Sequence, residues 1–256
     1  MPETSVTDGT TSPETPISGD VILKLESISK QFPGTLALDH VNFDVRGGEV
    51  HVLFGENGAG KSTLIQLVAG VYRQSSGTIQ FKGQEVSLTS VQQARDLGVS
   101  AVFQEFSLVP ELSVEDNLFL GSELTRGPFL NKVLLRKQAR ETLDRLGFPL
   151  KANSIVLYLT RAEQQMVEIA KAFRTKPSIM IFDEPTASLT EKETERLFQL
   201  IEQLKTQGIG IIYITHRMNE IKRIGDRITV LRDGRLIDTI PVEEASDQKL
   251  VELMTG

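Results

Sequence analysis

The amino-acid sequence predicts an α/β fold whose core is interrupted by a helical insertion. From Val21 onward, apolar runs of strand length alternate with stretches of helical periodicity. The stretch 106–174 shows helical patterns only. With 39% hydrophobic and 24% charged residues, the chain has the apolar content of a packed, soluble core.

The first part of the core contains short strands around a glycine-rich segment. The strands expected before residue 106 are 21–25, 41–45, 50–54, 78–81 and 99–103. A helix is expected from Ser62 to Gly70, because glycine readily takes the left-handed conformation that ends a helix. A second, short helix is expected at 90–97.

The insertion and the second part of the core follow. Ser113 with Asp116 is typical of a helix N-cap, and helices are expected at 131–146 and 160–174. After Pro177 the expected strands are 179–182, 209–214, 228–231 and 236–240, and the expected helices are 190–207 and 217–224. Asp233-Gly234 predicts a hairpin between the last two strands.

Composition excludes several classes of protein. The chain has no cysteine, which excludes a disulfide scaffold, a thiolate zinc site and a cysteine nucleophile. No apolar run approaches the roughly 18 residues that cross a bilayer. A net charge of -6 argues against nucleic acid as a partner. At about 150 residues per domain, the length allows one large domain or two small ones.

Much of the negative charge lies in residues 1–20, which carry four acids and no base. This stretch is rich in Ser, Thr, Pro and Gly, so we expect a disordered acidic tail. It lacks the basic and apolar regions of a signal peptide. Residues 21–256, which are close to neutral, are expected to form one composite domain with its helical part at about 106–174.

A phosphate-binding motif follows the strand at 50–54. Its sequence is Gly55-Glu56-Asn57-Gly58-Ala59-Gly60-Lys61-Ser62, and a helix follows it. The glycines allow successive backbone N–H groups to point at phosphate oxygens, at the positive end of the helix dipole. Lys61 is expected to reach the β- and γ-phosphates, and the Ser62 hydroxyl to ligate Mg²⁺. The alternative, an ordinary glycine-rich turn, does not require Lys-Ser at the helix start.

A second motif consists of two acids after the apolar strand at 179–182. Asp183 and Glu184 are then expected at the sheet edge where α/β proteins bind ligands. Asp183 would hold Mg²⁺ through its water shell, and Glu184 would act as general base on the attacking water. Taken alone, such a pair could equally be a helix N-cap.

Five features follow one another along the chain: the phosphate-binding motif, a Gln after a strand, the helical insertion, the Asp183-Glu184 pair and a strand that ends in Thr-His. This order resembles the nucleotide-binding domain of ABC transporter ATPases over about 21–256. This resemblance implies a P-loop NTPase core with a mainly parallel sheet, an antiparallel β subdomain and a helical insertion. Three stretches are similar to the first nucleotide-binding half of bacterial monosaccharide importers of the ribose, galactose and xylose kind. These are Gly55 to Leu64, which includes Thr63 as a further nucleotide-binding residue, Gln164 to Ala172, and Thr215 to Ile221.

The resemblance also implies roles for single residues. Gln104 lies where the family has its Q-loop, which touches Mg²⁺ and the lytic water, and His216 matches the switch histidine that senses the γ-phosphate. Phe32 matches the aromatic residue that stacks on adenine, although a buried core Phe is the alternative. The stretch from Ala187 to Thr190 corresponds to the D-loop, and Thr190 with Glu193 also forms a capping box.

One motif departs from the family. The signature, usually Leu-Ser-Gly-Gly-Gln, is here Leu159-Thr160-Arg161-Ala162-Glu163. In the family this segment contacts the γ-phosphate bound to the opposite domain. Thr160 and Glu163 form a capping box, which specifies the helix start. The missing glycines reduce close backbone approach, and Glu163 places a carboxylate near the partner's phosphate.

The resemblance implies an ATP- and Mg²⁺-dependent ATPase subunit that powers import of a monosaccharide or related solute. Its expected partners are transmembrane permease subunits, a second nucleotide-binding domain in a head-to-tail dimer and, indirectly, a periplasmic or extracellular sugar-binding protein. It would lie peripherally on the cytoplasmic side of the inner membrane. The alternatives are a nucleotide-binding regulatory module with little turnover and a soluble ABC protein of translation or DNA repair. The chain is expected to be either a half-size subunit or one domain of a longer protein.

Overall fold

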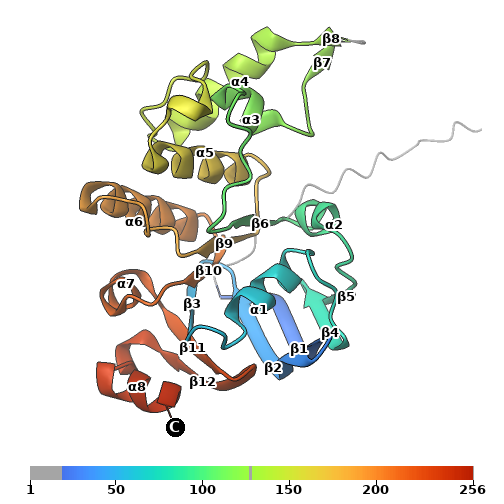
Figure 1. Ribbon diagram of the computed structural model, residues 1–256, viewed down its shortest axis with the longest axis vertical. Coiled ribbons are helices and arrows are strands. Elements are labelled where there is room, and N and C mark those ends of the chain that lie inside the picture. Colours follow the sequence, from blue (N-terminus) through green and yellow to red (C-terminus); the bar gives the residue numbers. More distant parts are fainter. Residues whose placement is uncertain (1–18, 127–128, 256) are drawn as a thin grey trace, which may run out of the picture.

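The computed structural model describes residues 19–126 and 129–255. Figure 1 shows two parts: a lower lobe built on β-sheets and an upper lobe of helices, joined near β6, β9 and α5. The expected acidic tail, apart from Gly19 and Asp20, falls outside the described residues. In the described part of the chain, no helix combines the length and the apolar character needed to cross a bilayer.

A six-stranded sheet forms the centre of the lower lobe, in the order β12-β11-β3-β10-β9-β6. The strands are β3 (Val50–Phe54), β6 (Val99–Val102), β9 (Ile179–Asp183), β10 (Gly210–Ile214), β11 (Arg227–Arg232) and β12 (Arg235–Pro241). All neighbours pair in parallel except β11 and β12, which form an antiparallel hairpin. The strands β3, β9 and β10 are buried almost throughout, as expected for a parallel sheet covered on both faces.

A second, antiparallel sheet has the order β2-β1-β4-β5. Its strands are β1 (Val21–Phe32), β2 (Thr35–Arg46), β4 (Ser76–Phe81) and β5 (Gln84–Val86). One hydrophobic core joins this sheet to helix α1 (Lys61–Val68) and to one face of the central sheet, including Ile181 and Ile212. Because α1 is packed against both sheets, the segment that leads into it is held on both sides.

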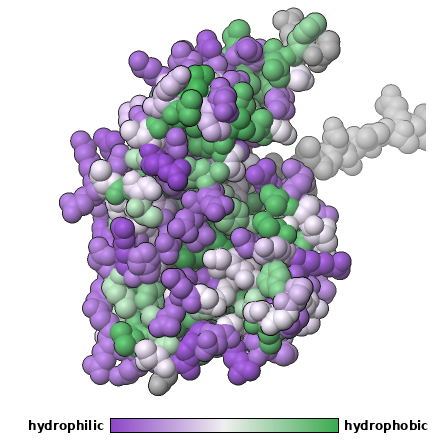
Figure 2. Space-filling model, viewed as in Figure 1, coloured by the Kyte–Doolittle hydropathy of each residue, from purple (hydrophilic) through white to green (hydrophobic). Residues whose placement is uncertain are grey.

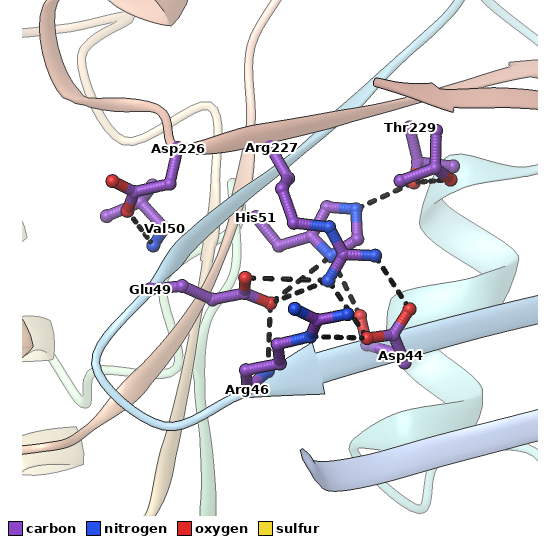
Figure 3. A network of polar contacts seen from close by, with 9 residues as sticks. Asp44, Arg46, Glu49, Val50, His51, Asp226, Arg227 and Thr229 are labelled. Carbon is purple, nitrogen blue, oxygen red and sulfur yellow. Dashed lines mark hydrogen bonds and ion pairs between the residues drawn. The ribbon is translucent and has the colours of Figure 1, made fainter. Parts of the chain in front are cut away.

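A partly buried polar network also joins the two sheets (Figure 3). The Arg227 guanidinium of β11 donates hydrogen bonds to Asp44 of β2 and to Glu49. The hydrogen bonds from Arg227 hold the pKa of Asp44 below its ordinary value. His51 of β3, which is 1% exposed, contacts the Asp44 carbonyl through Nδ1 and the Thr229 hydroxyl through Nε2. These bonds fix β2 against the strand that leads into the phosphate-binding motif.

A second hydrophobic core covers the opposite face of the central sheet. It contains helices of the lower lobe and of the upper lobe, so the two lobes share it. The remaining helices are α2 (Val91–Asp96), α3 (Val114–Phe119), α4 (Lys132–Arg145), α5 (Arg161–Phe173), α6 (Glu191–Thr206), α7 (Met218–Ile224) and α8 (Asp247–Thr255), with short 3-10 helices at Val156–Tyr158 and Val242–Glu244. Exposed apolar side chains gather at the tip of the upper lobe, among them Phe129 and Val133 (Figure 2).

The expectation of helices alone between 106 and 174 is wrong in detail, since β7 (Thr125–Arg126) and β8 (Phe129–Leu130) form a small antiparallel pair. Two-residue strands carry no periodicity that a sequence pattern can reveal. The three-residue edge strand β5 and helix α8, which buries only Leu250, were not predicted either. Strands β1 and β2 extend well beyond 21–25 and 41–45, because register shifts at bulges accommodate polar residues that interrupt their alternation.

Candidate functional site

The candidate site lies at one edge of the central sheet. The neighbouring strands β3, β10, β9 and β6 are parallel, so their carboxyl ends meet there, where open α/β sheets bind ligands. The segments that follow these strands carry Gly55, His216, Glu184 and Gln104. They border a cleft of about 490 Å³ lined by 35–37, 57, 58, 60–63, 104, 183, 184, 214, 233 and 234, and an adjoining cleft lined by 54–57, 104, 184, 216 and 254.

The phosphate-binding motif is a tight loop between β3 and α1. Gly55 and Gly60 have φ values of 152° and 102°, which residues other than glycine rarely adopt. A Cβ on Gly55 would lie 2.2 Å from the Leu231 carbonyl oxygen, and one on Gly60 would lie 2.8 Å from that of Ala37. Both positions therefore require glycine, because the backbone conformation disfavours other residues and there is no room for a Cβ.

The start of α1 leaves backbone donors available to a ligand. Gly60 is its N-cap and supplies no side-chain hydrogen bond to the first turn. The first N–H groups of a helix lack intrahelical partners and lie at the positive end of its dipole. Ser62 and Thr63, in this first turn, line the cleft. This arrangement suits an anionic group such as phosphate.

Lys61 folds back over the loop. Its Nζ donates to the carbonyl oxygens of Gly55 at 2.7 Å and Glu56 at 2.9 Å. Burial lowers the pKa of Lys61 from its ordinary value, although the nearby Glu184 and Asp183 carboxylates oppose this shift. The ammonium group is therefore bound to the loop and lies near the two acids, and Lys61 lines the same cleft as they do.

The charge on the Asp183 carboxylate is only partly compensated by its surroundings. Burial and the neighbouring Glu184 raise its pKa to about 6, and the attraction of Lys61 offsets this only in part. A half-buried carboxylate beside a second acid, on a cleft that Ser62 also lines, is a donor set that suits Mg²⁺, which takes few protein ligands and keeps several waters. The residues present thus fit this ion, with Gln104 on the same cleft.

Glu184 and His216 meet across the ends of β9 and β10. His216 Nδ1 lies 3.1 Å from Glu184 Oε1. The Glu184 N–H donates to the Ile214 carbonyl at 3.0 Å, which ties the turn after β9 to the end of β10. Glu184 has a φ of 46°, an unusual value for a residue other than glycine. Such strained residues often occur at active sites.

Comparison with known sequences identifies the family of this site. The family described as "ABC transporter" matches residues 38–187, which include the phosphate-binding loop, Gln104, the signature segment and both acids. The chain belongs to the ABC transporter family. The resemblance predicted from the sequence is thereby confirmed.

Curated relatives of this ABC chain are sugar import proteins by name. It is 50% identical over 235 residues to the ribose import ATP-binding protein RbsA 3 of Rubrobacter xylanophilus, covering 92% of the chain and 48% of the relative. It is 44% identical over 245 residues to the galactose/methyl galactoside import ATP-binding protein MglA of Escherichia coli O157:H7, covering 96% and 48%. The chain spans about half the length of the curated relatives it matches.

Solved structures confirm the predicted fold class. A nucleotide-free ATP-binding cassette from an ABC transporter has a TM-score of 0.80 at 26% identity, covering 93% of this chain and 100% of the other. A dimeric bacterial ABC transporter cassette has a TM-score of 0.75 at 27% identity, covering 86% and 99%. The mainly parallel sheet, the antiparallel sheet and the helices between β6 and β9 agree with this fold.

The ABC signature segment lies away from the cleft, at the start of α5. The capping box is present: the Thr160 N–H donates to Glu163 Oε2 at 2.8 Å, and the Glu163 N–H donates to the Thr160 hydroxyl at 3.2 Å. The Glu163 carboxylate is thus bound to its own helix start. Arg161 stacks over the Phe106 ring with its guanidinium carbon 4.5 Å from the centroid. Leu159 is partly buried and Ala162 is buried.

Phe32, at the end of β1, is not among the residues that line either cleft. Its ring packs edge-on against Tyr72, with centroids 5.1 Å apart, and the Lys30 ammonium lies 4.9 Å from its centroid. The ring is only partly buried. Adenine stacking on Phe32 stays a prediction.

Sequence reasoning missed part of the cleft wall. Thr35, Leu36 and Ala37 of β2 and Asp233 of the β11–β12 turn line the cleft beside the phosphate-binding loop. The Gly234 N–H donates to the Ala59 carbonyl at 3.1 Å, and this hairpin therefore braces the loop. The Asp-Gly pair predicted a hairpin, but nothing in the local pattern placed its tip against a loop so far away in sequence.

Proposed function

We propose that this chain binds and hydrolyses ATP, and that hydrolysis powers import of a monosaccharide or related solute. The observation that carries this proposal is that Lys61, Asp183, Glu184 and His216 line two adjoining clefts, which share Glu184 and Gln104, beside a helix start without a side-chain cap. This set combines phosphate-binding donors with a carboxylate that can act as a base. Phosphoryl transfer requires mainly such positioning and electrostatic stabilisation.

Each side chain has a distinct proposed task. The loop N–H groups and Lys61 bind the β- and γ-phosphates, and Glu56, Asn57, Gly58 and Ala59 shape the loop around them. Glu184 accepts a proton from the attacking water, while Gln104 and His216 orient the water and the γ-phosphate. Ser62, Gln104 and Asp183 would hold Mg²⁺, which supplies charge neutralisation of the phosphates when bound.

The proposed substrate class comes from the relatives. Those named for ribose import and for galactose/methyl galactoside import are 50% and 44% identical to this chain. The proposed partners are transmembrane permease subunits, a second nucleotide-binding domain arranged head to tail and, indirectly, a sugar-binding protein. The proposed location is the cytoplasmic face of the inner membrane, on those subunits. A dimeric cassette among the structural neighbours supports the paired arrangement.

A second candidate is a nucleotide-binding regulatory module with little turnover. The altered signature favours it, because the Glu163 carboxylate and the Thr160 N–H satisfy each other at the helix start. Phosphate release measured at high chain concentration, with and without the membrane subunits, separates the candidates. Turnover that the membrane subunits stimulate supports the importer, whereas saturable ATP binding without turnover in either condition supports the module.

Import itself is tested in membranes. The chain, tagged and expressed with its neighbours in its own cells, is purified from detergent extracts, and the co-purifying membrane proteins are identified. Deletion of the gene should abolish uptake of one labelled monosaccharide, and the wild-type gene but not Lys61→Ala should restore it. Unchanged uptake of ribose, galactose and xylose in the deletion strain would contradict the importer proposal.

A further inference from the structure

The carboxylate of Glu220 in α7 is buried next to the site and accepts four hydrogen bonds. Its Oε1 accepts from the Thr186 hydroxyl at 2.7 Å and from Arg217 Nη1 at 3.4 Å. Its Oε2 accepts from the Tyr213 hydroxyl at 3.0 Å and from the Thr215 hydroxyl at 2.8 Å. A buried carboxylate is costly unless donors satisfy it, and here both oxygens are fully used.

The donors come from the two segments that carry the proposed reacting groups. Thr186 is two residues after Glu184, in the turn that follows β9. Thr215 directly precedes His216, at the end of β10. Glu220, Thr186 and Thr215 are each only 2% exposed. One carboxylate therefore bridges the turn of the proposed base and the segment of the proposed switch histidine.

The turn at Glu184 needs such an anchor. The φ of 46° at Glu184 is strained for a glutamate, and the next residue is Pro185, which restricts the backbone further. A strained conformation persists only where surrounding contacts determine it. The backbone hydrogen bond from Glu184 to Ile214 is one such contact. The hydrogen bond from the Thr186 hydroxyl to Glu220 is a second, on the other side of the proline.

We propose that Glu220 is a positioning residue that sets the backbone of Glu184 and His216 relative to each other for hydrolysis, an inference that rests on the proposed ATPase function. Glu220 touches neither nucleotide nor water in this role. It holds Thr186 and Thr215, so that the Glu184 and His216 side chains, 3.1 Å apart, face the same point of the cleft. Displacement of a reacting group by about 1 Å can cost roughly 100-fold in rate.

A purely structural role predicts a different outcome. If the network only stabilises the core, its loss lowers stability without a selective effect on the chemical step. The positioning role predicts that kcat falls while ATP affinity is kept, because the phosphate-binding loop lies between β3 and α1 and the hydrogen bonds to Glu220 come from Thr186, Tyr213, Thr215 and Arg217, which are outside that loop. The two roles are separated by measuring ATP Kd, kcat and Tm on the same samples.

Glu220→Gln is the first variant, because it keeps the shape of the side chain and removes its charge. The expected result is a fall in kcat of about 10- to 100-fold with an ATP Kd within about twofold of the wild type. Thr186→Val removes one donor and should lower kcat by a smaller factor, whereas Thr186→Ser, which keeps the hydroxyl, should restore it. These threonine variants keep the test decisive if Glu220→Gln does not fold.

Glu115→Gln is the matched control. Glu115 is also a buried carboxylate, 5% exposed and paired with Arg136, but it lies in α3 of the upper lobe. Its kcat should stay close to that of the wild type. In a His216→Ala background, Glu220→Gln should add little, because residues that act as a unit are not additive.

Three outcomes overturn the inference. In the first, Glu220→Gln lowers kcat no more than Glu115→Gln; in the second, its full effect persists in the His216→Ala background. If either result is found while the wild type hydrolyses ATP and Glu184→Gln does not, the ATPase function stands and only the role of Glu220 is removed. In the third, the wild-type chain hydrolyses no ATP in the presence of its membrane partners, which removes both proposals.

Discussion

The phosphate-binding loop and the signature segment both lead into a helix, yet their polar groups are satisfied in opposite ways. At the start of α1, Gly60 provides no side-chain cap, and Lys61 donates only to carbonyls of its own loop among the described contacts. At the start of α5, Thr160 and Glu163 cap each other. The first site leaves donors and charge for a ligand, whereas the second uses its donors within the helix.

This difference predicts that the loop and the signature segment contribute unequally to a site shared by two domains. In a head-to-tail pair, the loop of one domain would face the signature of the other. The loop follows the family pattern, and a Cβ on Gly55 or Gly60 would lie only 2.2 or 2.8 Å from a backbone carbonyl oxygen. The signature lacks both glycines of the family pattern and replaces one neutral residue by Glu163. Variants at each site test whether the two differ in function as they differ in structure.

The largest expected effect is that of Glu184→Gln on turnover. The amide cannot accept the proton of the attacking water, so kcat should fall by about 100- to 10,000-fold. ATP affinity should be kept, because Lys61 and the loop remain. Phosphate release and equilibrium binding of ATP, measured on the same protein, check this. Turnover at the wild-type rate would show that Glu184 is not the base.

Lys61→Ala should act on binding. Loss of hydrogen bonds between the ammonium and the phosphates costs about 3 kcal/mol, which is roughly 100-fold in ATP affinity. Calorimetric titration with ATP measures the change. Lys192→Ala, which removes an exposed lysine of α6, is the control and should bind like the wild type. An unchanged Kd in Lys61→Ala would remove the loop from the proposed site.

Asp183→Asn should stabilise the nucleotide-free chain in a pH-dependent way. Burial and Glu184 raise the pKa of Asp183 from 3.8 to about 6, so the fold loses stability as the pH rises from 3.8 to about 6, and the loss is complete above that value. Near pH 7.5 the variant should gain about 1–2 kcal/mol in free energy of unfolding, since solvent screens part of the repulsion, and it should gain less near pH 5.

Urea unfolding of both proteins at the two pH values measures this gain. Asp238→Asn, at an exposed position of β12, is the control. The same variant should also lose stabilisation by Mg²⁺-ATP, because Asp183 is a proposed ligand of the ion. A gain that is larger near pH 5 than near pH 7.5 would contradict the charge state assigned to this site.

The smallest expected effect is at the signature. Glu163→Gln keeps the capping box, since glutamine serves at this position, but removes a negative charge that would face the partner's phosphates. In the Glu184→Gln background, ATP-dependent self-association should tighten by about three- to tenfold, which corresponds to roughly 1 kcal/mol. Sedimentation with ATP measures it.

The control for this prediction is Glu193→Gln, which changes the same position of the second capping box, at the start of α6. It should leave self-association unchanged. Equal effects of both variants would mean that net charge, and not the signature, governs the pairing. A strictly monomeric Glu184→Gln variant with ATP would remove the self-dimer.

Much of the core could be predicted because its signals are local. Strand β3, the loop and both capping boxes follow from adjacent residues, and the structure places them as expected. The edge of the sheet that carries the site followed from strand order, since Asp183 ends one buried parallel strand and Gln104 follows another. The wall formed by β2 and the Asp233 turn, and the buried Glu220 network, depend on contacts between distant segments. A single sequence carries no sign of such pairings.

The central claim is that the cleft after β3 and β9 binds and hydrolyses ATP. The most direct measurement is phosphate release by the purified chain with Mg²⁺-ATP, as a function of chain concentration, beside Lys61→Ala. We predict release by the wild type whose specific rate rises with concentration, and none above background from Lys61→Ala. Saturated ATP binding without phosphate release at any concentration, with or without the membrane subunits, or equal release from Lys61→Ala, would contradict the claim that this cleft hydrolyses ATP.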